Sequence, residues 1–331
     1  MARSKKRSRS MKKIEPAVTS MFFSMPLNDG AEPTPGPIAK FIDISQCASL
    51  VNRRFYRQGL NWAVGGFRLH TNGTTTGTVN IYKIQSTWMA SNAWMKSYAL
   101  WNQMNDQVLD NQPSIKPRYH DFKIHMDNDH VNNQFVQNLI PYNEDKLGTQ
   151  TEFVQGEWTR SLLEMPNTDA AGLPSPGETK PYALKMHGYD SSNSKALIQG
   201  YADSRAVPTL DDPTTQADAD TGWMNLLLDS GQSFDDIAAN LQSIGEDMPY
   251  SQLLYPGARG NAEDPSVHAI CNISQTTVGG TTGAVGGSFQ CGLIKIVSNL
   301  VDPSAASAFE LELILVPGPH RGYLCVPMQD V

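Results

Sequence analysis

The sequence predicts an all-β sandwich in which helices are confined to the segments that connect the strands. Short runs of alternating apolar and polar residues recur along the chain, and turns rich in Gly, Asn and Asp separate them. Hydrophobic residues make up 40% and charged residues 18% of the 331 positions, which is typical of a soluble globular protein. A sandwich with long loops would use this length as a single domain.

Positive charge is concentrated at the start of the chain. Seven of the 26 Lys and Arg residues lie in the first thirteen positions without an acid, so the remaining chain holds 19 cations against 33 carboxylates, a formal charge of −14. Such a leader is too polar to fold alone, and we expect it to bind nucleic-acid phosphates by counterion release. Nuclear import is a second use of the same segment, and a solvated tail is the alternative. The cations are Arg3, Lys5, Lys6, Arg7, Arg9, Lys12 and Lys13.

The boundary between leader and folded body is predicted near Ile38. Residues 26–37 are rich in Pro and Gly and do not suit regular structure, so residues 1–37 are interpreted as a basic arm and linker and residues 38–331 as the folded domain. Ile14-Glu15-Pro16 interrupts any apolar run after Lys13, so we expect no secretory signal. No apolar stretch reaches the length that a membrane-spanning helix needs.

About eight strands are predicted. In residues 60–69 the apolar side chains occupy even-numbered positions before Gly65-Gly66 and odd-numbered positions after them, as a β-bulge requires. The Asn72-Gly73 turn suggests a hairpin with the next strand, around Val79 and Ile81. Alternation also predicts a half-buried strand at 121–127 and strands at 267–273, 289–297 and 309–315, with weaker candidates at 152–160 and 182–187.

Two helices are expected in the connections. The first is marked by Ser91 as its cap and by an aromatic stripe, which we interpret as a face packed against a sheet rather than a ligand shelf. The second begins at Ser233 and ends at Gly245, within an elaborated loop region of about residues 188–264. Eight antiparallel strands with helices in the connecting loops are typical of a jelly-roll sandwich. The stripe of the first helix is Trp94, Tyr98, Trp101, Met104 and Val108.

Residues 51–59, together with Thr87-Trp88, Asn92-Ala93-Trp94 and Trp101, resemble capsid proteins of circular, Rep-encoding single-stranded DNA viruses, the bacilladnavirus-like capsid proteins in particular. The resemblance covers mainly the arm and residues 45–130, and residues 188–264 carry none of it. It implies a jelly-roll subunit of an icosahedral shell in the virion, with the genome inside, no catalysis and no membrane. It also implies kinship with coat proteins of small RNA viruses, and the host receptor is not indicated.

Arg53, Arg54 and Arg57 form a second basic cluster, close in sequence to the arm. They are candidates to extend the nucleic-acid-binding surface, and pairing with carboxylates between subunits is the alternative.

No metal, cofactor or enzyme site is expected. His120, His125 and His130 lie near Asp127 and Asp129, but on a strand His120 and His125 face opposite sides, so one ion would not collect them. Asp218, Asp220 and Asp229 fit a calcium loop poorly because Trp223 replaces the required glycine, although calcium between subunits stays open. Nucleotide-binding and hydrolase motifs are missing. Cys47, Cys271, Cys291 and Cys325 are interpreted as buried small hydrophobes in a reducing compartment.

Two further classes of protein compete with a self-assembling coat. A carbohydrate-binding β-sandwich with a basic tail would stay small in solution, whereas a coat protein would form large closed particles. A glycan- or phosphoester-cleaving sandwich enzyme would need convergent carboxylates in a concave pocket.

Overall fold

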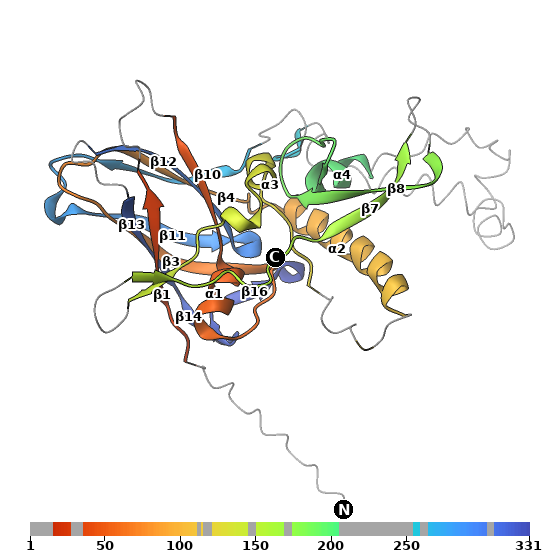
Figure 1. Ribbon diagram of the computed structural model, residues 1–331, viewed down its shortest axis with the longest axis horizontal. Helices are drawn as coiled ribbons and strands as arrows, with labels where there is room; N and C mark the ends of the chain where they lie inside the picture. Colours follow the sequence, from red (N-terminus) through yellow and green to blue (C-terminus); the bar gives the residue numbers. More distant parts are fainter. Residues whose placement is uncertain are drawn as a thin grey trace, which may run out of the picture.

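The computed structural model describes residues 16–27, 36–110, 114, 121–144, 150–168, 174–204, 254–258, 264–302 and 308–331 (Figure 1). The chain is mostly β, with antiparallel sheets in an arrangement compatible with a β-sandwich, so the predicted class is confirmed at that level. The eight longest sandwich strands are β1 (Ser20–Pro26), β2 (Ile38–Asp43), β3 (Leu60–His70), β4 (Thr76–Lys83), β10 (Ser266–Ile273), β11 (Thr281–Phe289), β12 (Leu293–Val301) and β13 (Ala308–Leu315).

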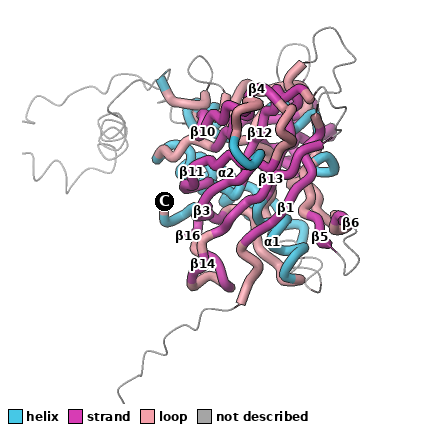
Figure 2. Tube along the Cα trace, turned by 90° about the vertical axis from the view of Figure 1, so that its left-hand side faces the viewer, coloured by secondary structure: helices cyan, strands magenta, loops and turns pink. Residues whose placement is uncertain are grey.

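Two sheets contain these strands. The first has the order β11-β3-β13-β1, which Figure 2 shows side by side, and continues into β5 (Tyr142–Glu144) and β6 (Gln150–Glu152). β16 (Cys325–Pro327) also pairs with β3. The second sheet has the order β10-β4-β12-β2. One apolar core combines side chains from both sheets, for example Trp62 and Phe67 from the first and Ile81 and Ile296 from the second.

The early strands pair with the late strands in reverse order. β1 lies antiparallel to β13, β2 to β12, β3 to β11 and β4 to β10. Residues 84–265 are therefore one long insertion between β4 and β10, and Figure 1 shows its helices beside the sheets. The registers Ser20↔Ile314, Asp43↔Leu293, Trp62↔Phe289 and Lys83↔Ser266 place the start of β1, the β2–β3 connection and the insertion at one end, here called the insertion end.

The predicted bulge in β3 is confirmed. Trp62 and Val64 are buried before the glycines, and Phe67 and Leu69 after them. The ladder with β13 shifts register between Ile314 and Leu315, opposite the glycines. Because of the extra residue, side chains at even-numbered positions face the core before the bulge and those at odd-numbered positions face it afterwards. The strand therefore keeps its apolar face inward along its whole length.

The predicted hairpin between β3 and β4 is wrong, because these strands belong to different sheets. The Asn72–Thr75 turn exists, but it carries the chain across the sandwich. Thr74 and Thr75 each donate a hydroxyl hydrogen bond of 2.9 Å to the buried Asp302, beside the end of β12. The turn is thereby held against the opposite sheet.

The folded domain begins earlier than the predicted boundary at Ile38. β1 lies within residues 1–37, pairs along its whole length with β13, and buries Met21, Phe23 and Met25. The arm-and-linker interpretation is therefore corrected for residues 20–26. Alternation over seven residues was present there, but the neighbouring prolines obscured it.

Two other strand predictions need correction. Residues 289–297 are not one strand, since a tight turn at Gln290–Gly292, with φ of 55° at Cys291 and 66° at Gly292, separates β11 from β12. Residues 121–127 are not a half-buried strand. His125 makes a single bridge to Lys185, and residues 122–127 are buried on both sides because the insertion packs over them. The weaker candidate at 152–160 overlaps only the end of β6, whereas that at 182–187 is confirmed up to Lys185.

A second apolar core contains side chains of the predicted aromatic helix and of other insertion elements, together with Phe41 and Leu293 of the sandwich. α2 (Trp88–Leu109) begins three residues before the expected cap, and Thr87 rather than Ser91 caps it, by accepting a hydrogen bond from Ala90 N. Trp94 and Trp101 are buried, so the packing interpretation of the stripe is confirmed for them. The predicted helix at 233–245 lies outside the described residues. The other insertion elements are α3 (Asn128–Asn133), η2 (Phe135–Gln137), β7 (Leu162–Thr168), β8 (Pro174–Lys185), β9 (Ser194–Ala196) and α4 (Leu197–Asp203).

Short elements complete the domain. They are α1 (Ile44–Asn52), η4 (Val278–Gly280), η5 (Gln290–Gly292), β14 (Pro317–Gly318), β15 (Gly322–Tyr323) and η6 (Met328–Asp330). All four cysteines are buried free thiols, as expected. Within the described ranges, the helices are too short or too polar to cross a bilayer.

Candidate nucleic-acid interface

The Arg53–Arg57 cluster lies on the connector between α1 and β3, at the insertion end. Asp43 caps the N-terminus of α1, because its carboxylate accepts hydrogen bonds from Ser45 N and Gln46 N. Arg53 follows the last residue of the helix in the left-handed conformation, with φ of 54°. The connector then passes Gly59, where φ is +92° and an added Cβ would lie 2.3 Å from the Trp94 ring. Close packing against α2 therefore fixes the path of the connector.

The three arginines diverge from this connector. Arg54 Nη1 lies 3.5 Å from the carbonyl oxygen of Pro16, the first described residue after the arm. The Arg53 guanidinium lies 5.7 Å from the centre of the Phe153 ring, and Arg57 lines a cleft between the connector and the insertion. Arg53 and Arg57 are exposed, and neither forms an ion pair with a described residue. Their charges are thus available to a partner.

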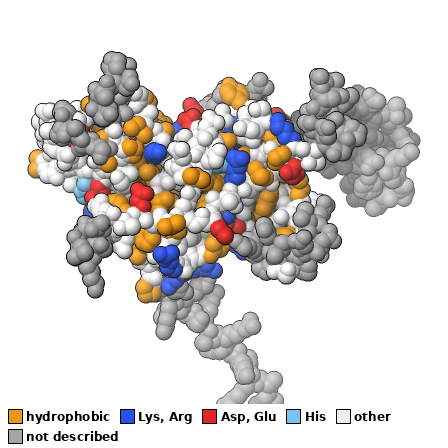
Figure 3. All heavy atoms as spheres, in the orientation of Figure 1, with side chains coloured by type: hydrophobic (Ala, Val, Ile, Leu, Met, Phe, Trp, Pro, Cys, Tyr) orange, Lys and Arg blue, Asp and Glu red, His pale blue; other side chains and the backbone are white. Residues whose placement is uncertain are grey.

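Arg321 joins this group, although no local pattern in the sequence pointed to it. It lies in the turn between β14 and β15, donates a 2.5 Å hydrogen bond to Phe55 O, and accepts one from Tyr56 Oη at its own carbonyl. We call Arg53, Arg54, Arg57 and Arg321 the basic patch. Figure 3 shows Lys and Arg side chains over the part of the surface where Figure 1 places α1 and β14.

The seven arm cations from Arg3 to Lys13 lie outside the described residues. Their role as a nucleic-acid-binding arm therefore stays a prediction. What the structure adds is the place where the arm joins the domain, because the described chain enters at Pro16 beside Arg54 and reaches β1 at Ser20.

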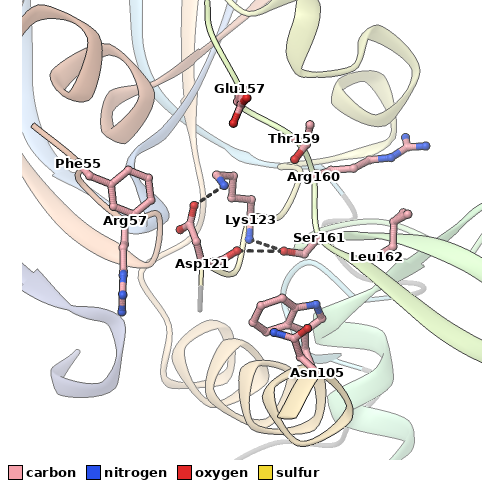
Figure 4. A pocket seen from close by; sticks show the side chains of 11 residues that line it. Phe55, Arg57, Asn105, Asp121, Lys123, Glu157, Thr159, Arg160, Ser161 and Leu162 are labelled. Atoms are coloured by element: carbon pink, nitrogen blue, oxygen red, sulfur yellow. Dashed lines mark hydrogen bonds and ion pairs between the residues drawn. The ribbon is translucent and has the colours of Figure 1, made fainter. Parts of the chain in front are cut away.

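A cleft of about 870 Å³ opens beside Arg57 (Figure 4). It lies between the connector, α2 and two extended segments of the insertion. Figure 4 shows Phe55 and Arg57 on one side of Asp121 and Lys123, with Arg160 and Leu162 on the other. The remaining lining residues are Trp101, Asn105, Glu157, Thr159 and Ser161.

The floor of the cleft is held by an ion pair and by backbone contacts. Lys123 pairs with Asp121, and its ammonium lies 4.6 Å from the centre of the Trp158 ring. Ser161 Oγ accepts a 2.9 Å hydrogen bond from Lys123 N, which joins the two extended segments. The Asp121 carboxylate is thus already neutralised, which argues against a pair of free carboxylates for acid/base catalysis.

A buried carboxylate anchors this floor to the sandwich. Asp43 accepts hydrogen bonds from Gln58 Nε2 at 2.9 Å and Trp158 Nε1 at 3.1 Å, and Gln58 Oε1 accepts from Ile124 N. Burial, opposed by these hydrogen bonds, raises the pKa of Asp43 to about 6. The network connects β2, the connector and the insertion, so the geometry of the cleft depends on the fold around it.

The structure brings His125 and His130 together, with ring centres 4.8 Å apart. His130 Nδ1 accepts from Met126 N, and its Nε2 therefore donates to Asn138 Oδ1, so both nitrogens of the neutral ring are occupied. Asp127 caps α3 and pairs with Lys295. Throughout the described ranges, no three His, Cys, Asp or Glu side chains are placed to hold a metal ion. His120, Asp218, Asp220 and Asp229 lie outside those ranges.

No protein-family model, curated protein or solved structure matches this chain. Function is therefore inferred from the arrangement of strands, the basic patch and the cleft.

Proposed function

We propose that this chain is a structural coat protein that assembles into a closed icosahedral shell and packages a single-stranded DNA genome through its basic arm. The observation that carries the proposal is the strand order. Sheets ordered β1-β13-β3-β11 and β2-β12-β4-β10, with early strands paired to late strands in reverse, support a jelly-roll topology for the sandwich. Viral coats use this fold, and so do lectins and cupins, so the fold alone does not decide the function.

The position of the arm supports the coat-protein function over the others. The segment carrying seven cations joins the sandwich beside Arg54, one member of the basic patch, while the rest of the chain is strongly acidic. Such an arrangement confines phosphate binding to one end of the subunit. In a shell, that end would face the genome, and the resemblance of the sequence favours single-stranded DNA over RNA.

Exposed edge strands support self-association. β10 and β11 end their respective sheets, and they expose Val267, Ile270 and Val285 by 51%, 62% and 69%. Edge strands with exposed apolar side chains are typical of surfaces that bind another chain. Repeated around symmetry axes, contacts of this kind would close a shell of identical subunits. The virion is the proposed location, with the host nucleus during assembly.

A carbohydrate-binding sandwich is the second candidate, because aromatic and amide side chains meet in the cleft. Phe55, Trp101 and Asn105 are residue types that bind sugar rings. Sugar binding, however, gives no role to the arm or to the charges of Arg53 and Arg57, which form no ion pair with a described residue. A small RNA virus coat protein would share every structural feature above and differ only in its genome.

Deletion of residues 1–13 is expected to abolish nucleic-acid packaging while the domain still folds. The arm supplies most of the counterion release, and it precedes β1, so its loss removes no sandwich strand. The ratio of absorbance at 260 and 280 nm of purified particles, and the amount of nuclease-protected nucleic acid, measure packaging. Circular dichroism is the control for folding, and DNase against RNase sensitivity identifies the genome. Normal nucleic-acid content in particles of the truncated chain would contradict the proposal.

A further inference from the structure

We propose that the cleft beside Arg57 binds an unpaired stretch of nucleic acid, with a base stacked on Phe55 and phosphates held by Arg57 and Arg160. The inference rests on the proposed function, and it names a site in the folded domain, separate from the arm, where single strands are distinguished from duplexes.

The aromatic side of the cleft is preformed. Phe55 is 50% exposed, although a large apolar ring would normally be buried. Its position is fixed all the same, because its carbonyl accepts from Arg321 and its ring centre lies 6.3 Å from that of the buried Trp158. One side of the ring thus packs against the protein while the rest is open to a partner. Aromatic rings placed in this way bind unpaired bases by stacking, without sequence preference.

The charges of the cleft favour an anion. Arg57 and Arg160 are exposed, and neither forms an ion pair or a side-chain hydrogen bond with a described residue. Asp121 and Lys123 neutralise each other, and among the described residues of the lining Glu157 is the one further carboxylate. The cleft therefore has net positive charge on a domain that is otherwise acidic. Free guanidinium groups bind phosphate through forked hydrogen bonds, a role that a neutral sugar ligand would not need.

The location fits a strand that is first bound by the arm. Arg54 contacts Pro16, and Phe55 and Arg57 lie one and three positions after Arg54 in the connector. Three consecutive residues span at most about 10 Å, so the cleft lies within a few nucleotides of the arm junction. A single strand neutralised by the arm could continue over the basic patch into the cleft.

A duplex is the natural negative probe, because its bases already stack on each other and offer no free face to Phe55. We would measure binding of full-length protein to a fluorescent ten-residue oligothymidylate and to a ten-base-pair duplex. The variants are Phe55→Leu, which keeps apolar area but removes the ring, and Arg160→Gln. Tyr189→Leu and Lys180→Gln are the matched controls, since Tyr189 is 44% exposed and both residues lie outside the cleft.

The expected result is specific to single strands. Phe55→Leu should weaken binding of the oligothymidylate by about fivefold or more and leave duplex binding unchanged, because stacking on an aromatic ring is lost. Arg160→Gln should lower the slope of log affinity against log salt by about 0.7, the value for one phosphate contact on a single strand. The two control variants should bind both probes as the unmodified protein does.

Replacement of all seven arm cations by Gln separates this proposal from the proposed function. If the arm variant loses binding but Phe55→Leu and Arg160→Gln bind the oligothymidylate normally, the cleft proposal is wrong and the role of the arm stands. If the arm variant binds both probes normally, the role of the arm fails. Photocrosslinking of unmodified protein to an oligonucleotide carrying 5-iododeoxyuridine needs no variant to fold. Crosslinks at Phe55 or Trp101 are expected, and crosslinks confined to other peptides would overturn the proposal.

Discussion

Lys295→Met is expected to lower the free energy of unfolding by about 3–5 kcal/mol at neutral pH, because it leaves a buried carboxylate without its counterion. Lys295 lies on β12, and its ammonium contacts Asp127 Oδ2 at 2.6 Å and Asp129 Oδ2 at 2.7 Å, at the start of α3. The side chains of Lys295 and Asp127 are only 10% and 5% exposed. Burial opposes the charge of Lys295, but the two aspartates prevail and raise its pKa. The ion pair joins the sandwich to the insertion.

Urea unfolding followed by circular dichroism measures this effect. Lys195→Met is the matched control, because the Lys195–Asp190 pair has a similar separation of 3.0 Å but is 31% and 43% exposed, and such a pair contributes about 1 kcal/mol or less. The double variant Lys295→Met/Asp127→Asn should recover part of the lost stability. It removes the charge of the carboxylate that has no counterion, and the Asn side chain is still able to cap α3. Equal stability of Lys295→Met and Lys195→Met would contradict the account.

The folded domain is expected to lose stability steeply between pH 6.5 and pH 5, because three histidines are buried in neutral form. Burial lowers the pKa of His125 to about 2 and those of His130 and His187 to about 3. Below pH 6.5 these histidines bind protons in the unfolded chain but not in the folded chain. The stabilisation is therefore complete above pH 6.5 and is lost as the pH falls toward 3. At pH 5 each histidine costs about 2 kcal/mol relative to neutral pH.

Asp43 acts in the opposite direction but does not compensate. Because burial raises its pKa to about 6, the folded state takes up a proton before the unfolded state does as the pH falls from 6 toward 4. This gain offsets about 1 kcal/mol at pH 5, against roughly 6 kcal/mol lost by the three histidines together. The net effect of acidification is therefore destabilising.

Urea unfolding at pH 7.5 and pH 5.0 tests the sign and the size. His187→Met should reduce the loss between the two pH values by about 2 kcal/mol, since one titrating group is removed. Neither ring nitrogen of His187 has a hydrogen-bond partner among the described residues, so the change breaks no hydrogen bond there. The half-exposed His268, changed to Met, is the control. A domain as stable at pH 5.0 as at pH 7.5 would disprove this interpretation of the buried histidines.

The sequence correctly predicted features that depend only on residues close together in the chain. The parity switch at Gly65-Gly66 and the aromatic face of α2 follow from which side chains are buried within one element, and both were confirmed. Pairing between strands is not a local property. The Asn72–Thr75 turn looks like a hairpin turn, yet hydrogen bonds to Asp302, distant in sequence, make it a crossing between sheets. β11 was not predicted, because its glycines leave little alternation of apolar and polar side chains.

In the candidate site, too, groups of neighbouring residues were predictable from the sequence, and contacts between distant residues were not. Arg53, Arg54 and Arg57 are recognisable in sequence because they are neighbours, whereas Arg321 reaches them only through the β14–β15 turn. The cleft unites the connector, α2 and two segments of the insertion, and no periodicity relates these parts. The predicted strand at 121–127 was wrong for the same reason, since packing of the insertion buries both of its faces.

Imaging of the purified full-length protein, mixed with single-stranded DNA at low ionic strength and neutral pH, tests the central claim most directly. The account predicts closed particles of uniform size, seen by electron microscopy, that protect the DNA from nuclease. A protein that stays monomeric at high concentration and leaves the DNA fully digestible would contradict it.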